Sequence, residues 1–345
     1  MYAVSGVGPA WAGENALTPK GSQEALKNMT FVRKLPIAGA STTTASFADP
    51  SSEFSLDAAP LSYETVNTEV DAARRVFWCR LNPQGRPCFS PQLLRDVAAM
   101  HSSIEARFRG ADRRDPPFRY FVCASAIPGI FNLGGDLGLF RTLIGAGDGE
   151  GLRRYGHAAV EAIHRNHTAL NLPMVTIALV QGDALGGGFE CALAHDVIIA
   201  ERSAKFGLPE VLFNLFPGMG AYSFLSRRLG RAAAEKMILS GRIYTADELH
   251  EMGLVHTVVP DGEGQQAVND YVDANGRWHN AHQATFKAGR RVDPVTLDEL
   301  RDVVDGWAEA ALNLSEMDLR RMSRLAGAQN RRIAPAPKAA VAAAG

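Results

Sequence analysis

Hydrophobic and polar positions along this chain follow a regular succession of short apolar runs and longer segments with helical spacing. The short runs predict strands at 76–81, 120–125, 174–180, 197–200 and 204–207. Helical spacing predicts helices from 91 to about 107, at 152–169 and 297–312, and from 317 to about 331. Strands that alternate with helices, and then give way to helices alone, predict an α/β core followed by a helical C-terminal portion.

The two ends of the chain lack this periodicity. Residues 1 to about 60 are rich in Ser, Thr, Ala, Gly and Pro, and the segment IAPAPKAAVAAAG closes the chain. Such a composition predicts disorder, because it offers too little apolar surface to offset the conformational entropy lost on folding. We therefore predict a disordered N-terminal extension at 1–60, a core at 61–260, a helical region at 261–332 and a disordered tail at 333–345.

The composition is typical of a soluble globular protein with balanced charges. The 345 residues include 36 basic and 37 acidic side chains, which gives a net charge of −1. This balance does not favour a nucleic acid or an anionic membrane as a partner, and no apolar run is long enough to span a bilayer. The four cysteines, at 79, 88, 123 and 191, show neither CxxC pairing nor metal-ligand spacing. We expect reduced thiols, no metal site, no secretory signal and a cytoplasmic location.

A glycine-rich stretch carries the first chemical signal. In LVQGDALGGGFECALAHDVIIA, three glycines at 186–188 precede a predicted short helix from Phe189 to about His195. Backbone N–H groups at a helix N-terminus lack helical partners, and glycines let a ligand oxygen approach them. Taken alone, the run could equally be a tight turn with close helix–sheet packing.

A second glycine loop changes that balance. The segment FNLGGD at 131–136 also follows a predicted strand and precedes a helix-like run at 137–140. Neither loop fits a phosphate-binding motif. Two such loops could each direct one N–H at the same carbonyl oxygen, which is the geometry of an oxyanion hole.

Two glutamates among apolar residues are candidates for proton transfer. Glu190 lies in the first turn of the predicted short helix, where the helix dipole lowers a carboxyl pKa and desolvation raises it. Glu210 follows Pro209, an ordinary start for a helix, but its other neighbours are also apolar. Either glutamate could merely complement a helix N-terminus. Together, beside two donor loops, they predict a proton-transfer site. His195 is expected to be a cap or core residue, and no GxSxG nucleophile elbow is present.

These residues together resemble the crotonase (enoyl-CoA hydratase/isomerase) superfamily from about residue 66 to 332. The resemblance rests on the segment ALVQGDALGGGFECALAHDVIIAERSAKFGLPEVLFNLFPGMG. It implies an α/β spiral of strand–strand–helix turns whose C-terminal helices trimerise. It also implies that the amides of Gly135 and Gly187 form the oxyanion hole, and that Glu190 and Glu210 are catalytic. Many relatives without hydratase activity lack one of these glutamates, so their joint presence favours addition or removal of water, with no metal or redox cofactor.

A narrower resemblance points to the branch that makes diffusible signal factors. It rests on FNLGGDLGLF, VQGDALGGGFE and GLPEVLFNLFPGMGAYSF. Those enzymes dehydrate 3-hydroxyacyl chains on acyl carrier protein and then cleave the thioester, releasing cis-2-unsaturated fatty acids for bacterial signalling. Gly138 stands where hydratases often have a lysine beside the CoA nucleotide. Losing the contact between that lysine and the nucleotide would matter less for a substrate on a carrier protein.

The same resemblance implies a mechanism and a substrate pocket. Glu210 would remove the α-proton while Glu190 protonates the departing hydroxyl, and Glu190 would then activate the water that cleaves the thioester. The acyl chain is expected in a pocket lined by Leu133, Phe213, Met219, Trp307 and Leu325.

Partners and alternatives follow from the family. The substrate is expected on the phosphopantetheine of acyl carrier protein or on CoA. Expected partners are acyl carrier protein, further copies of the chain in a trimer or dimer of trimers, and a sensor kinase. Two other functions stay open: an enoyl-CoA hydratase without thioesterase activity, and a non-catalytic scaffold that binds acyl thioesters or a signalling partner.

Overall fold

Two β-sheets form the centre of the fold. The computed structural model describes residues 62–112 and 114–333, so the disorder predicted at 1–60 and after 333 lies outside the described residues. The larger sheet contains, in spatial order, β1 (Val66–Asp71), β2 (Val76–Leu81), β3 (Tyr120–Ser125), β5 (Val175–Val180), β7 (Val197–Glu201) and β10 (Thr257–Val259). The smaller sheet contains β4 (Gly129–Asn132), β6 (Gly182–Leu185), β8 (Lys205–Gly207) and β9 (Ile243–Thr245). Only the β1–β2 and β8–β9 pairs of these sheets are antiparallel.

The chain passes between the two sheets in a regular spiral. β3, β5 and β7 of the larger sheet are each followed at once by β4, β6 and β8 of the smaller one, and helical segments come next. After β4 these are α2 (Leu137–Gly145) and α3 (Gly149–His167), and after β6 it is α4 (Gly187–Leu193). The predicted α/β spiral is therefore confirmed.

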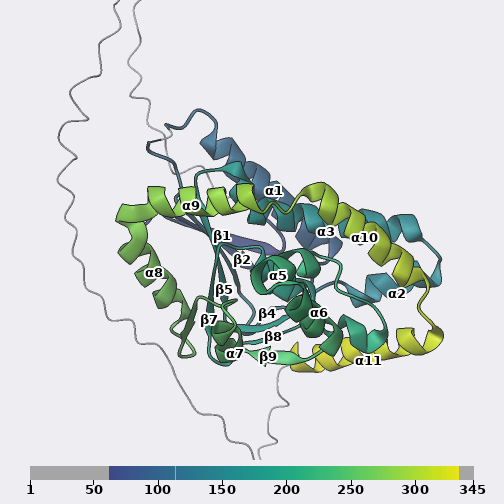
Figure 1. The fold of residues 1–345 in the computed structure, drawn as a ribbon. Coiled ribbons are helices and arrows are strands. Elements are labelled where there is room, and N and C mark those ends of the chain that lie inside the picture. The colour runs from purple at the N-terminus through teal and green to yellow at the C-terminus, as the bar shows by residue number, and fades with distance from the viewer. Residues whose placement is uncertain (1–61, 113, 334–345) are drawn as a thin grey trace, which may run out of the picture. The chain divides into compact units, whose positions relative to one another are not determined.

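Helices cover both faces of the larger sheet (Figure 1). α1 (Pro91–Phe108) and α3 pack on one face, whereas α8 (Gly264–Asn275) and α9 (His279–Val292) pack on the other. The alternation of side chains along each strand produces this division. On β2, Phe77 and Cys79 belong to the core on the α1 side, while Val76 and Trp78 belong to the core on the α8 side.

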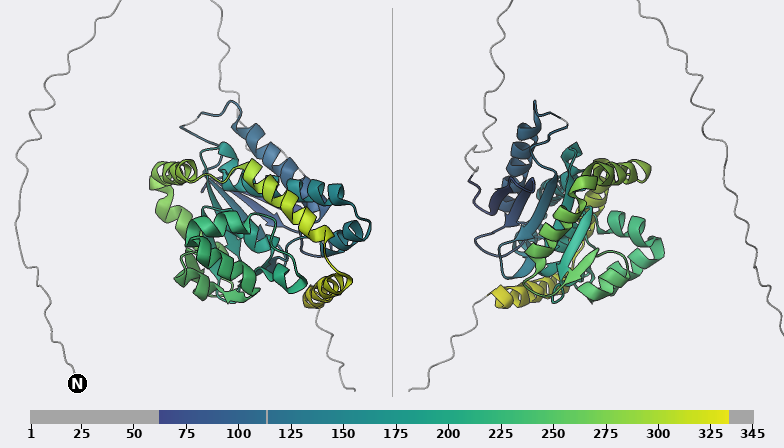
Figure 2. Two further views of the ribbon diagram at one scale, coloured as in Figure 1. Left: turned by 45° about the vertical axis from the view of Figure 1, so that its right-hand side comes forward. Right: turned by 90° about the vertical axis from the view of Figure 1, so that its left-hand side faces the viewer.

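The last two helices bring the end of the described chain back to the smaller sheet. α10 (Leu297–Leu312), which has the predicted bounds, packs along α3. α11 (Glu316–Ile333) contacts α2 and the short 3₁₀ helix η2 (Pro209–Phe213) (Figure 2). The remaining helices are α5 (Ala221–Leu229), α6 (Arg231–Ser240), α7 (Ala246–Glu251), η1 (Ala169–Asn171) and η3 (Gly276–Trp278). Within the described ranges, the helices are too short or too polar to cross a membrane.

The structure corrects three local predictions near the glycine loops. The helix predicted from Phe189 begins at Gly187, because Gly186 turns the chain at φ 53° and its carbonyl accepts the N–H groups of Phe189 and Glu190. Glu210 lies in the 3₁₀ helix η2 and not in an α-helix. The loop predicted at 131–136 also contains the end of β4, whose glycine and asparagine weaken the apolar pattern that marks a strand. The four cysteines are free and buried.

Candidate active site

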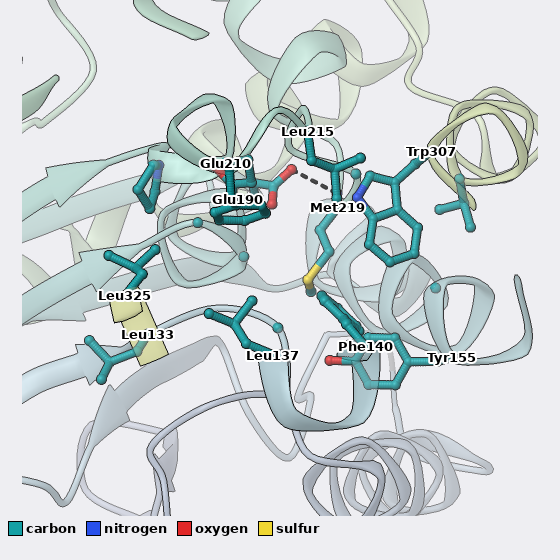
Figure 3. Close-up of a pocket in the computed structure, with 18 residues that line it drawn as sticks. Leu133, Leu137, Phe140, Tyr155, Glu190, Glu210, Leu215, Met219, Trp307 and Leu325 are labelled. Atoms are coloured by element: carbon teal, nitrogen blue, oxygen red, sulfur yellow. Dashed lines mark hydrogen bonds between the residues drawn. The ribbon is translucent and has the colours of Figure 1, made fainter. Parts of the chain in front are cut away.

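Three loops meet at one edge of the smaller sheet. They follow β4, β6 and β8, which are parallel neighbours, so their carboxyl ends lie at the same edge. The first loop carries Gly134 and Gly135, the second carries the glycines at 186–188, and the third leads to Glu210. This topology brings the two predicted donor loops and the two predicted carboxyl groups into one place (Figure 3).

The glycines allow the first two loops to touch backbone to backbone. A Cβ on Gly134, which has φ 90°, would lie 2.9 Å from the backbone nitrogen of Gly187. A Cβ on Gly188 would lie 2.0 Å from the carbonyl oxygen of Asn132. No side chain can be inserted at such distances without moving one backbone against the other. The glycine runs are therefore required by the close packing of the loops as well as by access for a ligand.

Two backbone donors remain available in these loops. Gly135 and Gly187 both line the same pocket. Neither of their N–H groups donates to an acceptor within residues 62–112 and 114–333. Gly187 is the first residue of α4, where an N–H has no helical partner. These two groups are thus the available donors for a carbonyl oxygen in the pocket.

Glu190 is a buried carboxylate with two backbone donors. Its side chain is only 1% exposed, and its Oε1 accepts the N–H of Met219 at 2.7 Å and that of Ala221 at 2.9 Å. Burial raises the pKa of Glu190 to about 7, and the two hydrogen bonds act against that rise because they favour the charged form. Desolvation therefore outweighs the two backbone hydrogen bonds at Glu190.

The burial of the Glu210 carboxyl group is less compensated by hydrogen bonds than that of Glu190. The residue is half-buried, but its Oε2 is buried and has no hydrogen-bond partner in the described part of the chain. Burial and, second, the charge of Glu190 raise the pKa of Glu210 to about 8. An unpartnered buried oxygen is costly when ionised, so this carboxyl group retains a proton more readily than Glu190 does.

An apolar pocket joins the donors to the carboxyl groups. The structure places every sequence-predicted site residue at this pocket, namely Leu133, Gly135, Gly187, Glu190, Glu210, Phe213, Met219, Trp307 and Leu325. The cavity left between the side chains is about 50 Å³. Trp307 packs against the backbone of Gly218, where a Cβ would lie 2.7 Å from the indole Cγ. Met219, Trp307 and Leu325 thus approach the carboxyl groups from separate elements (Figure 3).

Several lining residues were not anticipated from sequence. They include Leu137, Phe140, Tyr155, Gly156, Gly218 and Val304. Leu137 and Phe140 directly follow the loop that carries Gly134 and Gly135. Their position in the sequence could therefore have indicated that they lie near the pocket. Tyr155 and Val304 lie on long helices, where helical spacing marks a residue as core without saying what it faces.

Metal ligation finds no support in this pocket. Across the described residues, no group of three or more His, Cys, Asp or Glu side chains is placed to hold a metal ion. The polar chemistry of the pocket consists of two carboxyl groups with raised pKa values and two backbone N–H donors. This set can polarise a carbonyl and move protons beside it.

Known proteins share both the sequence pattern and the fold. The sequence profile of the enoyl-CoA hydratase/isomerase family matches residues 104–292. The chain is 40% identical over 131 residues to the mevalonyl-coenzyme A hydratase SIDH of Beauveria bassiana, covering 38% of this chain and 42% of that protein. It is 32% identical over 202 residues to a probable enoyl-CoA hydratase of Mycobacterium leprae, covering 58% and 70%. The matches span about half of the length of several curated relatives.

A solved structure shows the same fold. The enoyl-CoA hydratase of Bacillus halodurans superposes with a TM-score of 0.64 at 23% identity, covering 75% of this chain and 99% of that one. The similarity extends over nearly the whole of that protein and shows that the two chains share one fold.

Proposed function

This chain belongs to the enoyl-CoA hydratase/isomerase family, and we propose that it adds water to, or removes water from, an acyl thioester bound in the Glu190–Glu210 pocket. The observation that carries this proposal is the pairing of two buried carboxyl groups with raised pKa values beside two free backbone donors. Hydration needs one group to take a proton from water and another to give a proton to the α-carbon. The pocket supplies both.

The backbone donors would act on the thioester carbonyl. Bound between the amides of Gly135 and Gly187, that oxygen gains negative charge when water adds to the β-carbon or when the α-carbon is deprotonated. Donors whose hydrogen bonds strengthen as charge develops stabilise the transition state more than the bound substrate. They therefore lower the activation barrier and do not merely tighten binding. Loss of one such donor typically costs about 3 kcal/mol of transition-state stabilisation.

The environments of the two glutamates favour opposite roles in proton transfer. Glu190, held by two N–H groups, is the better carboxylate, and Glu210, with an unpartnered oxygen, is the better acid. In the hydration direction Glu190 would activate the water and Glu210 would protonate the α-carbon. Dehydration requires the reverse arrangement, with the proton on Glu190, and so begins from the less populated form of the pair.

The finer proposal is that the same site also cleaves the thioester. A water activated by Glu190 would attack the carbonyl carbon, the carbonyl oxygen would gain charge in the same cradle, and the thiol would leave with a proton. One oxyanion hole can serve both steps because each builds charge on the same oxygen. Together with the resemblance to diffusible signal factor synthases, this supports release of a cis-2-unsaturated fatty acid from acyl carrier protein.

One incubation separates the candidate functions. Purified full-length protein is mixed with 3-hydroxydodecanoyl acyl carrier protein, and products are identified by mass spectrometry and NMR. Free 2-enoic acid supports the finer proposal, whereas a 2-enoyl thioester without free acid supports a hydratase without thioesterase activity. Binding without any turnover overturns the enzymatic proposal and favours a scaffold. The matched variants are Glu190→Gln and Glu210→Gln, with Glu251→Gln, exposed on α7, as the control.

A further inference from the structure

Tyr155 is a buried tyrosine whose hydroxyl reaches the loop that carries Gly135. It lies on α3, far from that loop in sequence, and is 8% exposed. Its hydroxyl donates to the carbonyl oxygen of Phe89 at 2.5 Å and accepts the backbone N–H of Asp136 at 3.2 Å. Burial raises the pKa of Tyr155, so the hydroxyl keeps the proton that it donates.

Phe89 also binds the same loop through its own backbone N–H group. The backbone N–H of Phe89 donates to the carbonyl oxygen of Gly134 at 2.8 Å. The peptide before Gly135 is therefore tied directly to Phe89, and the peptide after it is tied to Phe89 through the Tyr155 hydroxyl. Both peptide groups that flank Gly135 are fixed to one buried residue.

These bonds determine where the Gly135 donor points. In a planar trans peptide, the C=O and N–H groups point in opposite directions. Since the Gly134 carbonyl points at Phe89, the Gly135 N–H points away from Phe89, and Gly135 lines the pocket. The peptides of the described residues are trans.

The ring of Tyr155 supports the same loop by packing. It meets the ring of Phe140 edge-on, with centroids 5.1 Å apart and an interplanar angle of 83°. Phe140 in turn lies against Gly135, where a Cβ would come within 2.5 Å of its Cζ. Hydroxyl and ring thus constrain the loop at two separate points.

From these contacts we infer that Tyr155 is a positioning residue that sets the direction of the Gly135 N–H toward the substrate carbonyl. The inference rests on the proposed function, because it concerns the oxyanion hole of that same site. A backbone N–H whose direction fluctuates forms its optimal hydrogen bond to the substrate less often. The resulting loss of stabilisation is greatest in the transition state, where the carbonyl oxygen carries most charge. Removing the hydroxyl should therefore lower kcat more than it raises KM.

The kinetic test compares Tyr155→Phe with Tyr63→Phe in the full-length protein. Tyr63→Phe removes one hydroxyl hydrogen bond, to Ser103 Oγ at 3.1 Å, whereas Tyr155→Phe removes two, and Tyr63 does not line the pocket. With trans-2-decenoyl-CoA as substrate, Tyr155→Phe is expected to lower kcat roughly 5- to 50-fold, with KM changed by less than about threefold. Tyr63→Phe should keep both constants. Wild-type kcat in Tyr155→Phe would overturn the inference.

A spectroscopic measurement separates this inference from the proposed function. The ketone analogue of decanoyl-CoA, in which CH₂ replaces the thioester sulfur and the carbonyl carbon is ¹³C-labelled, has no double bond, no 3-hydroxyl group and no cleavable thioester, so it can bind without hydration, dehydration or hydrolysis. Isotope-edited infrared spectra should show a lowered carbonyl frequency in the wild-type complex and a smaller lowering in Tyr155→Phe. If wild type turns over no enoyl thioester but this difference persists, only the proposed function fails. Equal frequencies in the two proteins overturn the role of Tyr155.

Thermal unfolding of each variant tests whether the substitution has caused a general loss of structure. If Tyr155→Phe does not fold, 3,5-difluorotyrosine at position 155 keeps the ring and the hydroxyl but makes the hydroxyl a stronger donor and a weaker acceptor. The carbonyl frequency of the bound ketone analogue is then expected to differ from that in the wild-type complex. An unchanged frequency in this folded variant would count against the inference.

Discussion

The carboxyl group of Glu210 occupies the space that a side chain on Gly186 would need. A Cβ on Gly186 would lie 2.5 Å from Glu210 Oε1, and Gly186 also has φ 53°, in the left-handed region. The glycine that follows β6 thus allows the chain to turn and leaves room for a functional group from a different loop. This contact is specific enough to test.

Gly186→Ala is expected to displace the Glu210 carboxyl and to lower kcat at least about tenfold, because proton transfer depends on its position. The matched control is Gly253→Ala, which has a similar φ of 76° but no atom within 4 Å of the added Cβ. Both variants should lose about 1 kcal/mol of stability from backbone strain. Steady-state kinetics and thermal unfolding distinguish them. An active Gly186→Ala protein would show that the position of Glu210 is not critical.

The pair of glutamates should produce a bell-shaped dependence of kcat/KM on pH. With the pKa of Glu190 raised to about 7 and that of Glu210 to about 8, the pair holds one proton mainly between these values. Activity should fall on the acidic side, where both groups are protonated, and on the alkaline side, where both are ionised. Among the residues that the structure describes, no histidine lines the pocket. A profile that stays flat from about pH 6 to 9 would contradict the assignment.

The raised pKa of Glu210 also predicts how stability changes with pH. The unfolded carboxyl group ionises near its ordinary value of 4.5, whereas the folded one keeps its proton up to about pH 8. The native state therefore binds the additional proton between these values, and stability falls as pH rises through this window. Glu210→Gln removes the effect and should be more stable than wild type at pH 9, by about 1–3 kcal/mol, with little difference near pH 5.

Denaturant unfolding at several pH values measures this difference directly. Glu251→Gln, which changes an exposed glutamate, should follow the wild-type curve at each pH. If the free energies of unfolding of Glu210→Gln and wild type differ by a constant amount from pH 5 to 9, the carboxyl of Glu210 is not the group that titrates in this window.

The side chain of Met219 is expected to control which acyl chains fit. Its Sδ lies 2.4 Å from the position of a Cβ on Gly187, and the pocket has only about 50 Å³ of free volume. Met219→Ala should raise kcat/KM for longer or branched chains relative to short ones. The bond from the Met219 N–H to Glu190 belongs to the backbone and is retained. The cost in stability should be about 2–5 kcal/mol, as for other buried methionines.

A second methionine provides the control for that experiment. Met237 on α6 is 2% exposed and does not line the pocket. Met237→Ala should therefore show a similar loss of stability with unchanged chain-length preference, measured on a series of 2-enoyl-CoA substrates. Equal preferences in the two variants would show that Met219 does not select the substrate.

Much of the fold was predictable from sequence because it is encoded in local patterns. Apolar runs marked β2, β3, β5 and β7, and helical spacing marked α1, α3, α10 and α11. β4 and β6 were missed as strands, because glycine and polar residues interrupt their apolar pattern. The glycine loops and both glutamates were also visible, since a glycine run and a carboxylate among apolar residues each violate an ordinary local preference.

Only the tertiary structure decided how the two glutamates differ and which distant residues complete the pocket. The donors to Glu190 are the N–H groups of Met219 and Ala221, 29 and 31 residues along the chain, whereas the Oε2 of Glu210 has no hydrogen-bond partner among the described residues. Tyr155 and Trp307 reach the site from α3 and α10, on helices whose spacing shows that they are buried but not what they face. Local sequence determines the conformations and burial that each segment prefers. The pKa of a carboxyl group and the direction of a backbone donor depend on atoms that only the packing of remote segments brings together.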